Sequence, residues 1–298
     1  KDRLEIIYLN SYTEYEKLSI AKNYLVPKLL DEHGLTSLQL QFTDKAILDI
    51  INYYTKEAGV RSLERLLAKI MRKVVKKVLT DKEQIFYLID SDSLEEYLED
   101  KLYNIFLNKE SKLKGVVNGL AYTEFGGDVL PIEVTYYKGN SNLLLTGSLG
   151  EVMQESAQIA LSYIKANSKK FFLKSEIFKN DIHIHLPEGA IPKEGPSAGI
   201  ALTTALLSSL TNTKISTKVA MTGEITLQGD ILEIGGLKEK VLGALRSGIT
   251  TIFLPEKNKK DLKDIPDELK RKITFIFVSN YKEVYDKLFS KEKDVVCS

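Results

Sequence analysis

One uncharged stretch, residues 197–210, constrains the fold more than any other part of the sequence. It reads SAGIALTTALLSSL and contains only small, apolar and hydroxyl-bearing residues. Such a run predicts a buried helix. The residues PKEGP precede it, and Gly195 and Pro196 among them predict a sharp turn. Ser197 would then lie at the N-terminus of the helix, where backbone N–H groups lack intrahelical partners.

The position of Ser197 has two interpretations. Serine is a common N-cap residue, so a purely structural role is the simpler one. The N-terminus of a helix also favours anions, and it could hold the oxyanion of an acyl-transfer reaction. Ser197 alone does not separate the two.

A second stretch, residues 221–240, reads MTGEITLQGDILEIGGLKEK and supplies a candidate base. We predict a helix from Leu237 to Arg246 in which Lys240 points inward while Lys238 and Glu239 stay in water. Burial disfavours the charged form of a lysine and so lowers its pKa. To act as a base near neutral pH, Lys240 needs a pKa about three units below the usual value of about 10.4.

Together, Ser197 and Lys240 would form a serine–lysine variant of the catalytic triad. A neutral Lys240 amine could take the proton from Ser197 and later return it to the leaving amine. Thr222, at the end of an apolar strand, could orient the amine by accepting a hydrogen bond from it. Because serine and lysine are common residues, a helix-capping serine and a snorkelling lysine remain alternatives at this point.

The composition is that of an ordinary globular protein. The 298 residues suffice for two domains, and a net charge of +1 gives no strong field toward nucleic acid or a membrane. No apolar run approaches the roughly 20 residues needed to span a bilayer. The chain begins at Lys1 without Met or a signal-peptide pattern, so we expect a fragment of a longer protein.

Cysteine and histidine are too few for a disulfide or a metal site. The single cysteine, Cys297, excludes an intrachain disulfide, which fits a reducing compartment. His183 and His185 alternate along a predicted strand and so face the same side. Since a zinc site needs more ligands, we expect both histidines to line a sheet face and expect no metal site.

Residues 1–90 predict a helical region. Thr13 and Glu16 have the spacing of a capping box, and the helix that they open should end near Pro27. A second helix should begin at Thr43 and end before Gly59.

A third helix should begin at Ser62, with an apolar stripe from Leu63 to Val78. For its basic face, solvation is the simpler interpretation and nucleic-acid binding the alternative. Arg61, beside the start of this helix, is either a surface arginine or a sensor that touches a nucleotide phosphate. The basic residues of the face are Arg65, Lys69, Arg72, Lys73, Lys76 and Lys77.

The rest of the chain predicts a linker and a second domain. A short strand at 85–89 and a helix capped by Ser93 and Glu96 precede a polar, lysine-rich segment, and we assign 91–115 to a linker. From residue 116 strands and helices alternate, with a β-meander expected over 116–146. The fold class is therefore α+β, with 116–298 as one domain.

The chain resembles the C-terminal part of Lon proteases, which are ATP-dependent AAA+ serine–lysine peptidases. The resemblance covers nearly the whole chain and extends N-terminally to YYTKEAGVR at 53–61, which looks like the helical lid of the Lon ATPase module. The other matching stretches are GLAYTE (119–124), GGD (126–128), LTGSLGE (145–151), DIHIH (181–185), PEGA (187–190), PKEGPSAG (192–199), MTGE (221–224) and GGLKEK (235–240).

The resemblance implies a helical AAA+ lid at 1–90 and an α+β proteolytic domain of the ribosomal-protein-S5-domain-2-like type at 116–298. It implies that Ser197 is the nucleophile, Lys240 the general base and Thr222 the residue that orients the lysine. Glu194 stands where many relatives carry aspartate, which affects the resting geometry of the site.

The resemblance also implies Arg61 as a sensor-2 arginine in the full-length enzyme, with ATP and Mg²⁺ as its cofactors. No GxxxxGK[ST] loop occurs in the 298 residues, so we expect no ATP hydrolysis by this chain alone and no cofactor for its peptide-bond chemistry. The implied partners are unfolded polypeptide substrates, a homohexameric assembly and, in the full-length family, DNA, but no membrane. The implied compartment is the bacterial cytoplasm, or alternatively the mitochondrial matrix.

Two rival functions remain. The chain could be a non-catalytic Lon-like module for assembly or nucleic-acid binding, since fold does not determine function. It could also be a nucleotide-binding lid that works with a separate ATPase chain. The presence of both Ser197 and Lys240 favours the peptidase.

Overall fold

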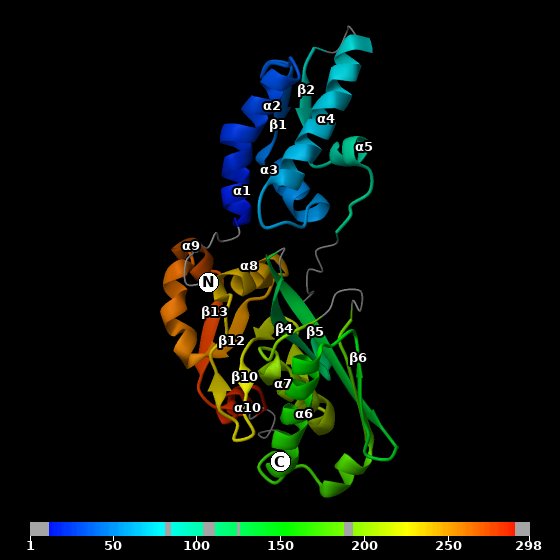
Figure 1. Cartoon of the computed structure of the whole chain (residues 1–298), viewed down its shortest axis with the longest axis vertical. Coiled ribbons are helices and arrows are strands. Elements are labelled where there is room, and N and C mark those ends of the chain that lie inside the picture. The colour runs from blue at the N-terminus through cyan, green and yellow to red at the C-terminus, as the bar shows by residue number, and fades with distance from the viewer. Residues whose placement is uncertain (1–11, 81–84, 104–110, 124–125, 188–192, 290–298) are drawn as a thin grey trace, which may run out of the picture. The chain divides into compact units, whose positions relative to one another are not determined.

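The computed structural model describes residues 12–80, 85–103, 111–123, 126–187 and 193–289 (Figure 1). Contacts divide the chain into two compact units, described residues 12–103 with Gly126 and the other described residues from 111 onward. Each unit has its own hydrophobic core. Lys1, Cys297 and residues 104–110 of the expected linker lie outside the described residues.

The first unit begins with a helix that continues through a proline. Its parts are α1 (Glu14–Ile20), a π-helical turn (Ala21–Leu25) and α2 (Val26–Glu32). The predicted capping box is confirmed, because the side chains of Thr13 and Glu16 each accept a hydrogen bond from the other's backbone N–H. The predicted end near Pro27 is wrong. Pro27 lies in the first turn of α2, just after the π-helical turn, where a missing N–H costs little.

Two further helices carry most of the remaining core of this unit. They are α3 (Asp44–Asp49), extended by a π-helical turn (Ile50–Tyr54), and α4 (Arg61–Thr80). The hydroxyl of Thr43 accepts from the N–H of Ala46 at 3.1 Å, which confirms the predicted start of the second helix. The apolar stripe of α4 is also confirmed, since it is buried at Leu63, Leu67, Ala68, Ile70, Met71 and Val74.

The start of α4 differs from the prediction. The helix begins at Arg61, and its cap is the carboxylate of Glu57, which accepts from the N–H groups of Ser62 and Leu63 at 2.8 Å each. A side-chain carboxylate at this end satisfies two orphan donors and complements the helix dipole.

The first unit is completed by two short parallel strands, β1 (Leu40–Phe42) and β2 (Tyr87–Ile89), and by α5 (Leu94–Leu98). The predicted capping box of Ser93 and Glu96 is wrong. Ser93 has helical dihedral angles, and its hydroxyl donates to the carbonyl oxygen of Asp90 at 3.0 Å, while Glu96 pairs with Lys77.

The second unit is built on a seven-stranded sheet within the described residues, in the order β13-β12-β9-β4-β5-β7-β6. The pairs β12–β13, β9–β12, β4–β9 and β6–β7 are parallel, and β5–β7 is antiparallel. The strands are β4 (Val116–Thr123), β5 (Gly126–Tyr137), β6 (Leu143–Thr146), β7 (Asp181–His185), β9 (Val219–Met221), β12 (Thr251–Pro255) and β13 (Thr274–Val278).

The predicted β-meander is wrong in one respect. Strand β6 does not pair with β5, because β7 lies between them and bonds to both. Two small antiparallel pairs accompany the sheet, β3 (Lys112–Lys114) with β8 (Lys214–Ser216) and β10 (Glu224–Ile225) with β11 (Ile231–Leu232).

Helices pack on both faces of the sheet. Residues that alternate along a strand enter different cores, as Ala220 and Met221 do on β9. On the Met221 face lie α6 (Glu151–Ala166), α7 (Gly199–Thr211) and α10 (Tyr281–Phe289). On the Ala220 face lie α8 (Leu237–Arg246), α9 (Asp267–Lys270) and a 3₁₀ segment (Glu256–Asp264). A second 3₁₀ segment, Ser175–Lys179, precedes β7.

The mixed architecture confirms the α+β prediction. Helix α7 is buried at every residue from Gly199 to Leu210, and α8 has the predicted bounds. Of the segment assigned to a linker, α5 packs into the core of the first unit, while β3 pairs within the second unit. None of the described helices combines the length and apolar character that a bilayer-spanning helix needs.

Candidate active site

Ser197 precedes α7 rather than capping it. The helix begins at Gly199 with Ala198 as its N-cap, and no side chain caps it. Ser197 lies in the turn that Gly195, with its φ of +90°, helps to form. The N-cap interpretation of Ser197 is therefore wrong, and its hydroxyl is available for another partner.

Backbone hydrogen bonds hold Ser197 against the strand that ends beside it. The N–H of Gly223 donates to the carbonyl oxygen of Ser197 at 2.8 Å, and the N–H of Ile200 donates to the carbonyl oxygen of Gly223 at 3.1 Å. A Cβ on Gly199 would come within 2.8 Å of the N–H nitrogen of Ile225, so only glycine permits this approach. These contacts fix the Ser197 turn to the segment that follows β9.

The side chains of Ser197, Thr222 and Lys240 meet, as the sequence predicted. Lys240 Nζ lies 3.0 Å from Ser197 Oγ and 3.1 Å from Thr222 Oγ1. The Thr222 hydroxyl donates to the carbonyl oxygen of Ser197 at 3.2 Å, so its lone pairs can accept from Lys240. The three residues come from the turn before α7, the end of β9 and the first turns of α8.

The environment of Lys240 makes the charged form of its amine less favourable than it is in water. Lys240 is 3% exposed and Thr222 is fully buried, while Ser197 is partly exposed. Burial lowers the pKa of Lys240 to about 8. Near neutral pH about a tenth of the molecules therefore carry a neutral amine that can accept a proton.

Two glycines that the sequence analysis did not assign to the site let α8 approach the sheet. A Cβ on Gly127 would overlap the carbonyl oxygen of Glu239, and one on Gly243 would overlap the backbone of Gly127. The guanidinium of Arg246 donates to the carbonyl oxygen of Gly127. Gly127 lies in β5, and its lack of a side chain brings Lys240 to the site.

The predicted oxyanion site depends on which backbone N–H groups around Ser197 are free to donate a hydrogen bond. The N–H groups of Gly199 and Ile200 already donate to the carbonyl oxygens of Pro196 and Gly223, at 3.1 Å each. Within the described ranges, the N–H groups of Ser197 and Ala198 have no hydrogen-bond acceptor. Donors for an oxyanion are therefore in the turn itself and not in the first turn of α7.

Three other residues of the sequence analysis also lie in the second unit. Glu194 is exposed, and its carboxylate lies against Gly150, the N-cap of α6, where a Cβ would overlap it. His183 and His185 lie on one face of β7, and both rings hydrogen-bond to the hydroxyl of Thr146, at 2.9 and 2.7 Å. The described residues contain no cluster of three potential metal ligands.

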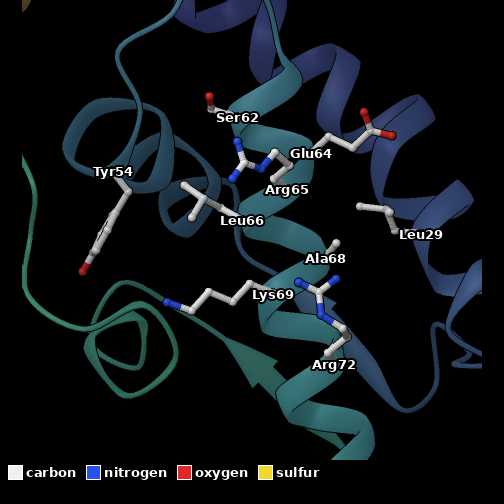
Figure 2. Close-up of a pocket in the computed structure, with 9 residues that line it drawn as sticks. All are labelled: Leu29, Tyr54, Ser62, Glu64, Arg65, Leu66, Ala68, Lys69 and Arg72. Atoms are coloured by element: carbon white, nitrogen blue, oxygen red, sulfur yellow. The ribbon is translucent and has the colours of Figure 1, made fainter.

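Arg61 is exposed at the first position of α4. A shallow pocket of about 510 Å³ lies further along this helix, and Figure 2 shows that Arg65, Lys69 and Arg72 of the basic face line it. Within it Glu64 pairs with Lys28 at 2.8 Å. All nine lining residues belong to the first unit, so this pocket is separate from the Ser197 site.

Family models match both units of the chain. Residues 31–86 match the Lon protease AAA+ ATPase lid domain, and residues 88–291 match the Lon protease C-terminal proteolytic domain. The boundary between the two models lies before α5, whereas α5 packs into the core of the first unit.

Curated relatives agree with these matches. The Lon protease of Mycoplasma mycoides subsp. mycoides SC is 53% identical over 289 residues, and that of Mycoplasma genitalium is 51% identical over 292. Both alignments cover 97% of this chain and 36% of the relative. Lon protease 1 of Bacillus subtilis is 49% identical over 294 residues, which is 98% of this chain and 38% of the relative.

The chain thus spans little more than a third of the length of these relatives. The two family models follow each other along the chain in the order in which its two units occur. The chain therefore belongs to the Lon protease family and carries the ATPase lid and the proteolytic domain of that family.

Proposed function

We propose that the second unit is a serine endopeptidase in which Ser197 is the nucleophile, Lys240 the general base and Thr222 the residue that orients Lys240. The observation that carries this proposal is the position of Lys240 Nζ, 3.0 Å from Ser197 Oγ and 3.1 Å from Thr222 Oγ1, in surroundings that lower the pKa of the lysine. The rest of the mechanism follows from this geometry.

In the first half-reaction, the neutral amine of Lys240 accepts the proton of Ser197 while Oγ attacks the peptide carbonyl carbon. The Lys240 ammonium then gives this proton to the leaving amine, the C–N bond breaks, and an ester of Ser197 remains. In the second half-reaction Lys240 takes a proton from water, which attacks the ester carbonyl carbon. The ester C–O bond then breaks, Lys240 returns the proton to Ser197 Oγ, and the acid is released. Thr222 accepts a hydrogen bond from Lys240 throughout, which keeps the amine lone pair directed at Ser197.

The tetrahedral intermediate needs donors for its oxyanion. The N–H groups of Ser197 and Ala198 are the candidates, because those of Gly199 and Ile200 are engaged. Preorganised backbone donors of this kind stabilise the charge that develops in the transition state.

Turnover of a small fluorogenic peptide tests the assignment. We expect Ser197→Ala and Lys240→Ala each to lower kcat/KM by at least about 10³-fold, because each removes a group that acts in the transition state. Lys238→Ala is the matched control, since Lys238 lies two residues away on α8 and is partly exposed. Cleavage near the parent rate in either of the first two variants would overturn the dyad.

A non-catalytic module for assembly or nucleic-acid binding is the rival function. The two functions differ in how Ser197 reacts with a fluorophosphonate, which forms a stable adduct only with an activated serine. A single adduct on Ser197 that is absent from Lys240→Ala supports the peptidase. If the folded chain stays unlabelled while a serine protease in the same reaction is labelled, the rival function is favoured.

For the longer protein we propose ATP-dependent degradation of unfolded or misfolded polypeptides by a homohexamer. The match to the ATPase lid and the names of the bacterial relatives support ATP dependence, protein substrates and the bacterial cytoplasm as the compartment. DNA binding by the basic face of α4 belongs to the same proposal. A nucleotide site needs a phosphate-binding loop, and this chain contributes only the Arg61 guanidinium, so we derive no hydrolysis step.

Arg61 can be tested separately from the peptidase. A lid that binds nucleotide should lose its nucleotide affinity in Arg61→Ala, as measured by titration with a fluorescent ATP analogue. If the unchanged chain binds no nucleotide, the function of a separate nucleotide-binding lid is excluded.

A further inference from the structure

Asn258 is a buried polar residue outside the Ser197 site. It lies in the 3₁₀ segment Glu256–Asp264 and is 1% exposed. Its Oδ1 accepts from the N–H of Ile234 at 3.0 Å, and its Nδ2 donates to the carbonyl oxygen of Ile234 at 2.8 Å. Nδ2 also donates a second hydrogen bond, to Asp261 Oδ2 at 2.7 Å. The side-chain amide thus pairs with the backbone of Ile234 much as a neighbouring strand would.

This pair lies at the entry to α8. Ile234 is followed by Gly235 and Gly236, and Gly236 is the N-cap of the helix in the left-handed conformation, with φ of 67° and ψ of 34°. No side-chain hydrogen bond caps α8. The N–H of Lys240 donates to the carbonyl oxygen of Gly236 at 3.1 Å, so the helical turn that carries Lys240 is built directly on this glycine.

Another contact between the same two segments is weaker. Lys260 and Glu233 form an ion pair at 3.1 Å, but both side chains are more than half exposed. Exposed pairs of this kind contribute little to a fixed geometry. Buried amide hydrogen bonds with both donors and the acceptor engaged are costly to break, so Asn258 is the main polar anchor between the segments.

We propose that Asn258 is a positioning residue for the reaction of Ser197, because it anchors the entry to α8 and so holds Lys240 between Ser197 and Thr222. The role rests on the proposed function of the second unit. Asn258 touches none of the reacting atoms and acts only through the backbone of Ile234 and the first turn of α8.

Loss of this anchor has a defined consequence for Lys240. If the entry to α8 moves, water gains access to the amine, and its pKa returns toward the ordinary value. Burial of the amine is what lowers the pKa of Lys240. Tyr122 on β4, Asp128 on β5 and the charged side chains of residues 256–264 lie on elements that pack against α8. The pKa of Lys240 is lowered by desolvation and not by the charge of these groups.

The test is the pH dependence of Ser197 labelling by a fluorophosphonate in Asn258→Ala, measured on the intact chain between pH 6 and 10.5. We expect the midpoint to rise by about one unit and the rate at pH 7 to fall about tenfold, with the rate near pH 10 within about twofold of the parent. Ser208→Ala is the control. Ser208 is fully buried, and its hydroxyl accepts from Gly115 at 2.8 Å and donates to the carbonyl oxygen of Thr213 at 2.6 Å near the far end of α7.

If Asn258 had only a structural role, Asn258→Ala would lower the folded fraction of the protein without moving the pH midpoint of Ser197 labelling. A folded Asn258→Ala whose midpoint stays within 0.2 units of the parent, in the way expected of Ser208→Ala, would overturn the proposal. If Asn258→Ala does not fold, the midpoint of Ser197 labelling is measured in Asn258→Gln instead. This variant keeps the amide but moves it by one methylene, and the same criterion applies to it. Failure of both to fold would reduce Asn258 to a stabilising residue and also overturn it. No labelling of the unchanged chain would instead contradict the proposed function itself.

Discussion

Helices α4 and α8 are both amphipathic, and both begin just after a glycine-containing turn. Each has a basic residue near its start, but this residue is exposed in α4 and buried in α8. Arg61 opens α4 and is exposed, as are Arg65 and Arg72 along the same helix. Lys240, in the first turns of α8, is 3% exposed. Helix α4 leaves these arginines exposed, whereas α8 buries Lys240.

The difference comes from what surrounds each helix. The buried residues of α4 form a single stripe, and the helix start is capped locally by Glu57. Helix α8 lies against the sheet through Gly127, against β4 and against the segment that contains Asn258. A lysine on a helix enclosed in this way cannot extend its amine into bulk water, so its pKa falls. Enclosure, and not residue type, lowers the pKa of a lysine here.

The largest expected effect comes from Gly127→Ala, which removes the close approach that distinguishes α8 from α4. The new Cβ would overlap the carbonyl oxygen of Glu239, so α8 must shift. We expect a loss of about 3 kcal/mol in stability and of most peptidase activity, measured by urea unfolding and peptide turnover.

Gly59→Ala is the counterpart before α4. A Cβ there meets nothing within 4 Å, so stability and turnover should not change. Equal effects of the two substitutions would contradict the claim that enclosure separates the two helices.

Thr222→Val removes the hydroxyl that Lys240 contacts within its enclosed site. Valine fills nearly the same volume but cannot accept from Lys240 or donate to Ser197. We expect kcat to fall about 10- to 100-fold, since the base loses its orientation, with KM little changed. Thr203→Val is the matched control, because Thr203 is also fully buried but bonds only to the carbonyl oxygen of Gly199 within α7. An unchanged kcat in Thr222→Val would show that α8 alone orients the lysine.

Lys240→Met should stabilise the protein at neutral pH. The folded-state pKa of about 8 lies below the ordinary value of 10.5, so between these values the unfolded chain binds more protons and the stability of the parent rises with pH. We expect the variant to be more stable by about 1–3 kcal/mol at pH 7, with the advantage shrinking toward pH 10.5.

Urea unfolding at several pH values measures this advantage. Lys76→Met is the matched control, because it removes a lysine from the exposed face of α4. A constant difference between parent and Lys240→Met from pH 7 to 10.5 would mean that Lys240 is not desolvated.

The smallest expected effect is at the start of α4. Glu57→Ala removes the carboxylate that accepts from Ser62 and Leu63, which should cost about 1 kcal/mol. Hydrogen exchange at the amides of these two residues should accelerate, and turnover by the second unit should not change. Unchanged protection at both amides would show that tertiary packing and not the local cap determines where α4 begins.

Local features of the fold were predictable from the sequence where they depend on neighbouring residues. The capping box at Thr13, the start of the second helix at Thr43, the apolar stripe of α4 and the bounds of α8 follow from spacing within one turn or one helix. The errors at Pro27 and Ser93 arose where a π-helical turn or a competing acceptor, the carbonyl oxygen of Asp90, changed the local geometry. The strand order could not be predicted from the sequence, because the position of β7 between β5 and β6 depends on contacts between residues more than thirty positions apart.

The amino-acid sequence was enough to identify Ser197, Thr222 and Lys240 as candidate residues for the chemistry. It also predicted an uncharged, buried helix directly after the serine turn. The folded chain was needed to show that the serine lies outside that helix, that its hydroxyl lies 3.0 Å from the lysine amine, and that the amine is enclosed. The physical reason is that a pKa and a hydrogen bond depend on what surrounds a group, and at Lys240 the surroundings come from glycines, amides and strands far away in the chain.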